Sequence, residues 1–267
     1  MTLPYLSAFR GALWAEFLKA RRSRVPWLTA LGFLLAPLVG GLFMIILKDP
    51  ERARSMGLIS AKAQLTAGVA DWPTYFGLLA QATAVGGAML FSLVTAWAFG
   101  REFSDHTAKE LLATPTPRGA IIAAKFVLIA VWAVSAVGLV FMLGLIVGNG
   151  VGLPGWSTAL LWRGASDLAV TAALTLALMP PVALLASVGR CYLPPMGWAL
   201  LTVFLAQIVA AIGWGAWFPW AVPALFSGLA GPRADQIGPQ SYILVALVFM
   251  AGLAATFAWW RSADQTR

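Results

Sequence analysis

The chain of 267 residues is 60% apolar and 10% charged, with a mean hydropathy of +0.83. A soluble domain is about half apolar and about a quarter charged, so this composition excludes an ordinary soluble domain and indicates a polytopic membrane protein. The formal charge of +8 does not indicate a nucleic-acid partner, because the basic residues stand at the ends of apolar runs.

The first segment, residues 5–24, predicts an amphipathic helix that lies in the cytoplasmic interface. One side of that helix carries Leu6, Phe9, Leu13, Trp14 and Phe17, while Glu16 and Lys19 lie elsewhere. The residues expected to anchor it among lipid headgroups are Trp14, Phe17, Arg21, Arg22 and Arg24. Such a helix serves as a topology anchor, as a contact for a partner, or as both.

Long uncharged runs predict six spanning helices within a single transmembrane domain, residues 1–267. Period-2 alternation is absent, so the spans are helices rather than barrel strands. The expected spans are residues 26–47, 75–99, 120–147, 168–188, 195–214 and 241–260. Glycine, proline and tryptophan interrupt residues 215–230, which predicts short re-entrant or interfacial helices before the last span.

The basic residues predict the orientation of the spans. With the N-terminus and C-terminus in the cytoplasm, twelve Lys and Arg residues face inward and six face outward. This distribution follows the positive-inside rule. The connection between the second and third spans is therefore expected in the cytoplasm.

That connection, residues 102–118, is a concentration of charge in a chain where charge is scarce. Thr107 and Glu110 fit a capping box, with Ser104 and Asp105 as alternative caps. The prolines at 115 and 117 end the helix that follows. The pattern predicts a discrete cytoplasmic helix of about two or three turns, although an ordinary connecting loop is the simpler alternative.

The run from Phe99 to Arg118, with Lys125 after it, resembles the stretch that follows the second span in permease subunits of type 2 ABC exporters. The matching features are an acidic residue, a leucine pair, a Pro-x-x-Arg turn and a lysine that opens the third span. Residues 15–23 are similar to the first interfacial helix of that family, especially of its drug and lantibiotic-immunity branch. Residues 218–223 resemble its short helices before the last span.

This resemblance implies a permease in the bacterial cytoplasmic membrane that pairs with a second permease copy, as a homodimer or a paralogous heterodimer. Each coupling helix would bind a cytosolic ABC ATPase subunit. The chain has no Gly-x-x-x-x-Gly-Lys-Ser/Thr stretch, so ATP and Mg²⁺ are expected on that partner and no cofactor on this chain. The implied ATPase-coupling residues are Glu102, Asp105, Thr107, Lys109, Glu110, Leu111, Leu112, Pro115 and Arg118.

Glu102 is expected at the membrane boundary, where a carboxylate needs a partner. The candidates for that partner are Arg101, Arg118 and Lys125. The only histidine, His106, is expected to be a surface residue, and no His, Cys or carboxylate cluster has the spacing of a metal site.

Two other function classes fit less well. A membrane anchor or sensor without transport activity would use the same cytoplasmic insert. An intramembrane enzyme needs a nucleophile and base within reach, or paired acids, and the spans offer neither. Scarce polar groups inside the spans instead favour export of a hydrophobic or amphipathic substrate, such as a drug, a peptide antibiotic or a lipid-like molecule.

Overall fold

The computed structural model describes residues 2–49, 69–105, 107, 110, 113–229 and 237–262, and these ranges contain helices and short connections but no strand. The longer helices are α1 (Thr2–Arg22), α2 (Val25–Lys48), α4 (Trp72–Ser104), α6 (Arg118–Val151), α7 (Thr158–Ala177), α8 (Met179–Gly189), α9 (Leu193–Ala211) and α11 (Pro239–Ser262).

Six stretches of the described chain are long and apolar enough to cross a membrane, which confirms the predicted number of spans. They are α2, α4, α6, α7 with α8, α9 and α11. The chain is therefore an all-α, multi-pass membrane protein. Among the described residues between α9 and α11 lie three short helices, η1 (Gly215–Trp217), η2 (Pro219–Ala221) and α10 (Val222–Phe226), inside the stretch predicted for short helices.

The fourth span differs from its prediction at residues 168–188. Its helix begins at Thr158, where Ser157 caps it by accepting a hydrogen bond from the backbone N–H of Leu160. The helix then breaks at Leu178 between α7 and α8. Pro180 and Pro181 explain the break, because neither has an N–H and each ring clashes with the preceding turn.

The expected helix over residues 102–118 also has different limits. α4 continues through Glu102 to Ser104, and α6 already begins at Arg118, directly after Pro117. Glu102 and Arg118 therefore belong to the flanking spans. Between them only part of the chain is described, and there Glu110 is helical.

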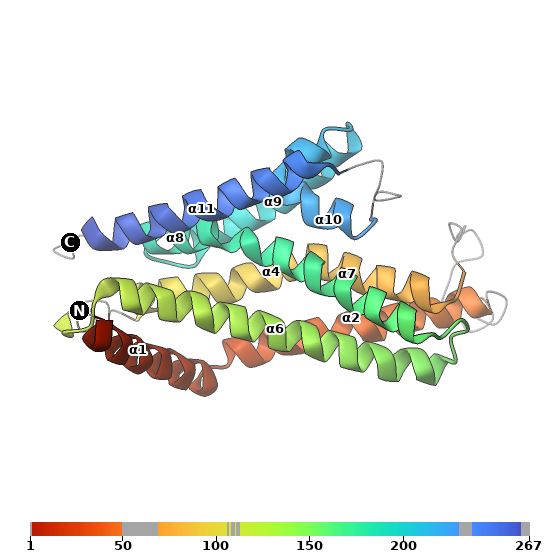
Figure 1. Ribbon diagram of the computed structural model, residues 1–267, viewed down its shortest axis with the longest axis horizontal. Coiled ribbons are helices and arrows are strands. Elements are labelled where there is room, and N and C mark those ends of the chain that lie inside the picture. Colours follow the sequence, from red (N-terminus) through yellow and green to blue (C-terminus); the bar gives the residue numbers. More distant parts are fainter. Residues whose placement is uncertain are drawn as a thin grey trace.

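Both termini lie at the same end of the bundle, where α1 runs alongside α6 (Figure 1). α4 has 33 residues and α6 has 34, so each is about 50 Å long at about 1.5 Å per residue, against about 30 Å of hydrocarbon. Their extra turns bring the end of α4 and the start of α6 together beside α1. This end carries the site described below.

Glycine allows close packing between α6 and α4. A methyl group at Gly148 would lie 2.5 Å from the ring of the buried Trp72, whereas one at Gly150 would meet nothing within 4 Å. Alanine favours a helix over glycine by up to about 1 kcal/mol at either position. The two positions thus differ in packing and not in propensity.

We predict that Gly148→Ala lowers the free energy of unfolding in detergent by about 1–3 kcal/mol, because the indole has to move. Gly150→Ala, two residues along the same helix, is the matched control and should leave stability unchanged or slightly higher. Chemical unfolding of both purified variants measures the difference. Equal stabilities would contradict the close approach of Trp72.

Candidate functional site

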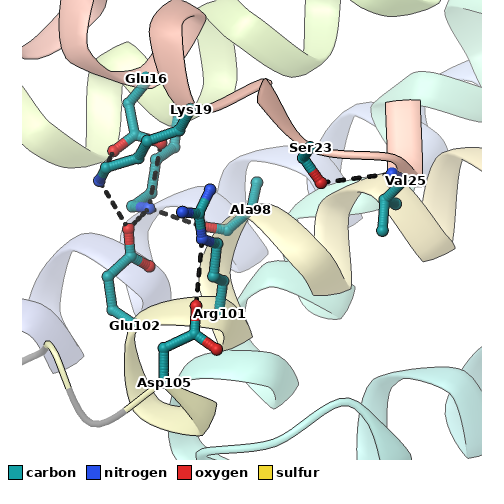
Figure 2. Close-up of polar contacts among 9 residues, drawn as sticks. Glu16, Lys19, Ser23, Val25, Ala98, Arg101, Glu102 and Asp105 are labelled. Atoms are coloured by element: carbon teal, nitrogen blue, oxygen red, sulfur yellow. Dashed lines mark hydrogen bonds and ion pairs between the residues drawn. The ribbon is translucent and has the colours of Figure 1, made fainter. Parts of the chain in front are cut away.

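Four charged side chains meet at the end of the bundle that holds the termini, and we call them the charge cluster: Glu16, Lys19, Glu102 and Lys125. Glu16 and Lys19 are one helical turn apart on α1. Glu102 lies near the end of α4, and Lys125 lies about two turns from the start of α6. Figure 2 shows Glu16 and Lys19 pointing from α1 toward Glu102. Three helices far apart in sequence are therefore joined at one point.

Lys125 is the centre of the cluster. Its Nζ lies 2.7 Å from Glu102 Oε1 and 3.4 Å from Glu16 Oε2, and it also donates to the backbone oxygen of Ala98. An ammonium group has three donors, so all three have acceptors here. The ammonium also lies 5.8 Å from the ring centroid of Phe99.

Lys19 closes the cluster on the side nearer to solvent. Its Nζ lies 2.7 Å from Glu16 Oε1 and 3.0 Å from Glu102 Oε1. Each carboxylate thus contacts both ammonium groups, and the cluster of two acids and two bases has no net charge.

Burial makes this neutrality necessary. Glu16 and Glu102 are each 3% exposed and Lys125 is fully buried, whereas the side chain of Lys19 is 27% exposed. A charge left unpaired in such surroundings costs several kcal/mol, of the order of 3–5. The cluster therefore fixes the relative positions of α1, α4 and α6, since moving one helix away would expose the others to that cost.

The pKa of Lys19, which lies outside the spans, reflects these contacts. Burial alone lowers the pKa of its ammonium, but the carboxylates of Glu102 and Glu16, with their hydrogen bonds, outweigh burial and raise the pKa above 10.5. Lys19 thus stays charged throughout the physiological range.

A second ionic contact lies next to the cluster. Arg101 Nε is 3.3 Å from Asp105 Oδ2, one turn along, and the guanidinium lies 5.5 Å from the ring centroid of Trp97. Figure 2 shows Arg101 and Asp105 beside Glu102 and below the Ser23–Val25 connection. Asp105 is also the C-cap residue of α4, and its N–H donates to the carbonyl of Arg101.

Arg118 binds the C-terminus of α11 rather than the cluster. Its Nη1 donates to the carbonyl oxygens of Trp260 and Arg261, at 2.9 and 3.2 Å. A cation is favourable at this position because the last carbonyls of a helix lack intrahelical partners. Trp260 Nε1 in turn donates to Ser187 Oγ at 2.9 Å, so α6, α8 and α11 are joined at the same end.

The other residues predicted to contact an ATPase lie in the segment between α4 and α6. Thr107 donates its N–H to the carbonyl of Glu102 at 2.9 Å, and Glu110 and Pro115 are exposed. Three of the predicted residues fall outside the described residues: Lys109, Leu111 and Leu112. Binding of an ATPase by Thr107 and the residues after it therefore stays a prediction.

The predicted interfacial anchors all lie on the outer side of α1 and its connection to α2. Each of them is exposed: Trp14, Phe17, Arg21, Arg22 and Arg24. Glu16 and Lys19 turn inward instead, and this was not predicted from the sequence. A signal was present, since an acid and a base at i and i+3 beside an apolar stripe fit a helix face that pairs with other charges.

Of the three partners considered for Glu102, Lys125 is the one that binds it. Arg101 pairs with Asp105, and Arg118 binds α11. Among the described residues, no group of three His, Cys, Asp or Glu side chains is placed to hold a metal ion. The cluster therefore joins α1, α4 and α6 through ion pairs.

Comparison with known proteins agrees with a transport role. The family model described as "ABC-2 family transporter protein" matches residues 12–206, which include all four cluster residues. The chain is 29% identical over 179 residues to the bacitracin transport permease protein BCRB of Bacillus licheniformis, covering 67% of this chain and 85% of that protein. No solved structure matches the chain.

We predict that Lys125→Met destabilises the protein by about 3–5 kcal/mol, because it leaves buried carboxylate charge without its main partner. The double variant Glu102→Gln/Lys125→Met should cost less than the sum of the single changes, since the two groups interact directly. Unfolding in detergent measures all three variants.

The matched control is Lys48→Met, which removes an exposed ammonium that donates to the carbonyls of Val151 and Gly152 at the other end of the bundle. It should cost no more than about 1.5 kcal/mol. If Lys125→Met costs no more than Lys48→Met, the cluster does not hold the helices together.

We also predict a pH dependence for the contribution of Lys19. Because its pKa is raised in the folded protein, its stabilising effect is complete below the unfolded value of about 10.4 and is lost as the pH rises through the folded value. The stability gap between wild type and Lys19→Gln should therefore be constant near neutral pH and shrink in the alkaline range. Arg21→Gln, which removes an exposed arginine charge from the same helix, is the control and should show a constant gap. A gap for Lys19→Gln that grows with rising pH would refute the assignment.

Proposed function

Because the chain belongs to the ABC-2 family of transporter proteins, we propose that it is the membrane-spanning subunit of an exporter driven by a separate cytosolic ABC ATPase. Membership makes it a permease subunit and implies an ABC ATPase as partner. The direction of transport, the substrate and the route of coupling are the proposed elements.

The charge cluster is the observation that supports this route of coupling. It lies at the base of the segment between α4 and α6, and the N–H of Thr107 in that segment binds the carbonyl of Glu102. A force on the segment therefore reaches Glu102, and through Lys125 and Glu16 it reaches α6 and α1. Such a contact moves three helices together.

The segment between α4 and α6 is proposed as the docking element for the ATPase. Its described residues Glu110, Ala113 and Pro115 are exposed and free to meet a soluble partner. ATP and Mg²⁺ would be bound by that partner, since this sequence lacks a P-loop motif. Asp105, Thr107, Lys109, Leu111 and Leu112 belong to the same proposed surface.

Orientation and location follow from the same proposal. Both termini and the docking segment share one end of the bundle (Figure 1), and twelve of the eighteen basic residues are assigned to that side. By the positive-inside rule, this distribution supports a cytoplasmic location for this end. We propose the cytoplasmic membrane of a bacterium as the location, and a dimer of two permease copies as the working unit.

The proposed substrate is hydrophobic or amphipathic, and a peptide antibiotic is one such class, because the similar protein is named for bacitracin transport. Several hydroxyls within the spans bind carbonyls of their own helix, as Thr171 binds Asp167 and Thr175 binds Thr171. Such groups offer little to a hydrated ion, whereas an apolar molecule needs few polar contacts.

The test is co-purification and reconstitution with an ABC ATPase subunit from the same organism. We predict that Glu110→Arg reduces both ATPase association and transport by at least about tenfold, because a reversed charge at an interface costs more than 1.4 kcal/mol. Asp49→Arg, at the other end of the bundle, should leave both unchanged. Uptake of substrate into inside-out vesicles reports export.

Stable association of the two subunits without nucleotide-dependent transport would favour a membrane anchor or sensor instead. Wild-type association and transport in Glu110→Arg would remove the docking segment from the proposal. Transport into right-side-out vesicles would refute export.

A further inference from the structure

A pocket of about 540 Å³ opens beside the charge cluster, and Lys19 is the cluster residue that lines it. Its walls come from the end of α1, the connection to α2, the last turns of α4 and the residue before α9. The lining residues that matter here are Lys19, Arg22, Leu93, Trp97, Arg101 and Tyr192. None of the functions proposed above uses this pocket.

The mouth of the pocket is basic. Lys19, Arg22 and Arg101 line it with a single carboxylate, Asp105. Asp105 offsets the charge of Arg101, and Glu16 and Glu102 hold the ammonium of Lys19. The charge of exposed Arg22 therefore remains in excess, and the pocket favours an anion.

Arg101 is held in place but not fully paired. Its Nε binds Asp105, its plane lies near the ring of Trp97, and its Nη1 is buried without a hydrogen-bond partner in the described protein. A buried donor that lacks an acceptor is costly, and a guanidinium is shaped to bind two oxygens of one phosphate. A phosphate bound beside Arg101 in this pocket would supply an acceptor for its guanidinium.

Apolar side chains line the same pocket beside the basic ones. Arg101, Trp97 and Leu93 follow one face of α4, and eight residues of helix separate Arg101 from Leu93, or about 12 Å. Val25 and Tyr192 line the pocket as well. A polar end and an apolar depth match a phosphate that carries a hydrocarbon tail, because tryptophan and arginine side chains meet such molecules at the headgroup level.

We propose that this pocket is a binding site for a phosphate group, either the headgroup of an anionic phospholipid or free phosphate, and that Arg101 and Arg22 bind it. The site goes beyond the proposed function and is independent of it, since binding needs neither the ATPase nor transport. A general attraction of the membrane surface for basic residues predicts a different result, because it treats every exposed arginine alike.

The experiment is native mass spectrometry of the full chain in detergent, titrated with phosphatidylglycerol, phosphatidylcholine or inorganic phosphate. The variants are Arg101→Gln, Arg22→Gln and the control Arg24→Gln, which removes an exposed arginine of the same connection that does not line the pocket. Arg101→Lys tests the guanidinium shape with the charge kept.

We expect phosphatidylglycerol to bind wild type more tightly than phosphatidylcholine. Affinity for phosphatidylglycerol should fall about tenfold or more in Arg101→Gln, because a charge-assisted hydrogen bond is lost. It should fall at least about fivefold in Arg22→Gln and less than that in Arg24→Gln. Arg101→Lys should keep only part of the affinity.

Binding of phosphatidylglycerol without binding of inorganic phosphate identifies a lipid site, and binding of both identifies a site for the phosphate alone. Equal losses in all three Gln variants, or no preference for phosphatidylglycerol over phosphatidylcholine together with no binding of phosphate, would overturn the proposal. Arg22 is exposed and its side chain makes no hydrogen bond or ion pair with another described residue, so its variant decides the question even if Arg101→Gln does not fold.

Discussion

The buried ammonium of Lys125 is the constraint on which this end of the protein depends. A lysine that is fully buried needs acceptors and opposite charge around it, and here two helices supply them. α4 provides the Ala98 carbonyl and the Glu102 carboxylate, and α1 provides Glu16. Lys19 then balances the second carboxylate. The position of α1 is thereby fixed by electrostatics as well as by its apolar outer face, which distinguishes it from a helix that only rests on the membrane.

Arg118 gives the same end of the bundle a second connection, this time to α11. The cluster joins α1, α4 and α6, whereas Arg118 and Trp260 join α6, α11 and α8. α6 takes part in both connections, and its first turn follows the proposed docking segment directly. A displacement of that turn would therefore act on both halves of the bundle. A force on the start of α6 would therefore be transmitted to both halves of the bundle.

Much of this fold could be predicted from hydropathy, because a spanning helix is long, apolar and bounded by charge. The six spans and the short helices near Pro219 and Pro223 follow from that pattern. The break at Leu178 did not, since Pro180 and Pro181 are apolar and leave a hydropathy profile unchanged. Glu102 and Lys125 were recognisable as a pair because both are charges at the ends of spans. Glu16 was not recognised, because the apolar face of α1 could be assigned without it and because its burial depends on Lys125, 109 residues away.

The neutrality of the cluster also explains why Arg101 stays outside it. Two carboxylates already balance two ammonium groups, so a guanidinium added to them would leave a buried excess of positive charge, which the low dielectric of the interior disfavours. Arg101 instead pairs with Asp105 and packs on Trp97, and its Nη1 is buried without an acceptor among the described residues. α4 thus contributes residues both to the neutral charge cluster and to the basic pocket. A phosphate bound by Arg101 would lie one residue from Glu102, so its presence would stabilise the end of α4 at the point from which the docking segment begins.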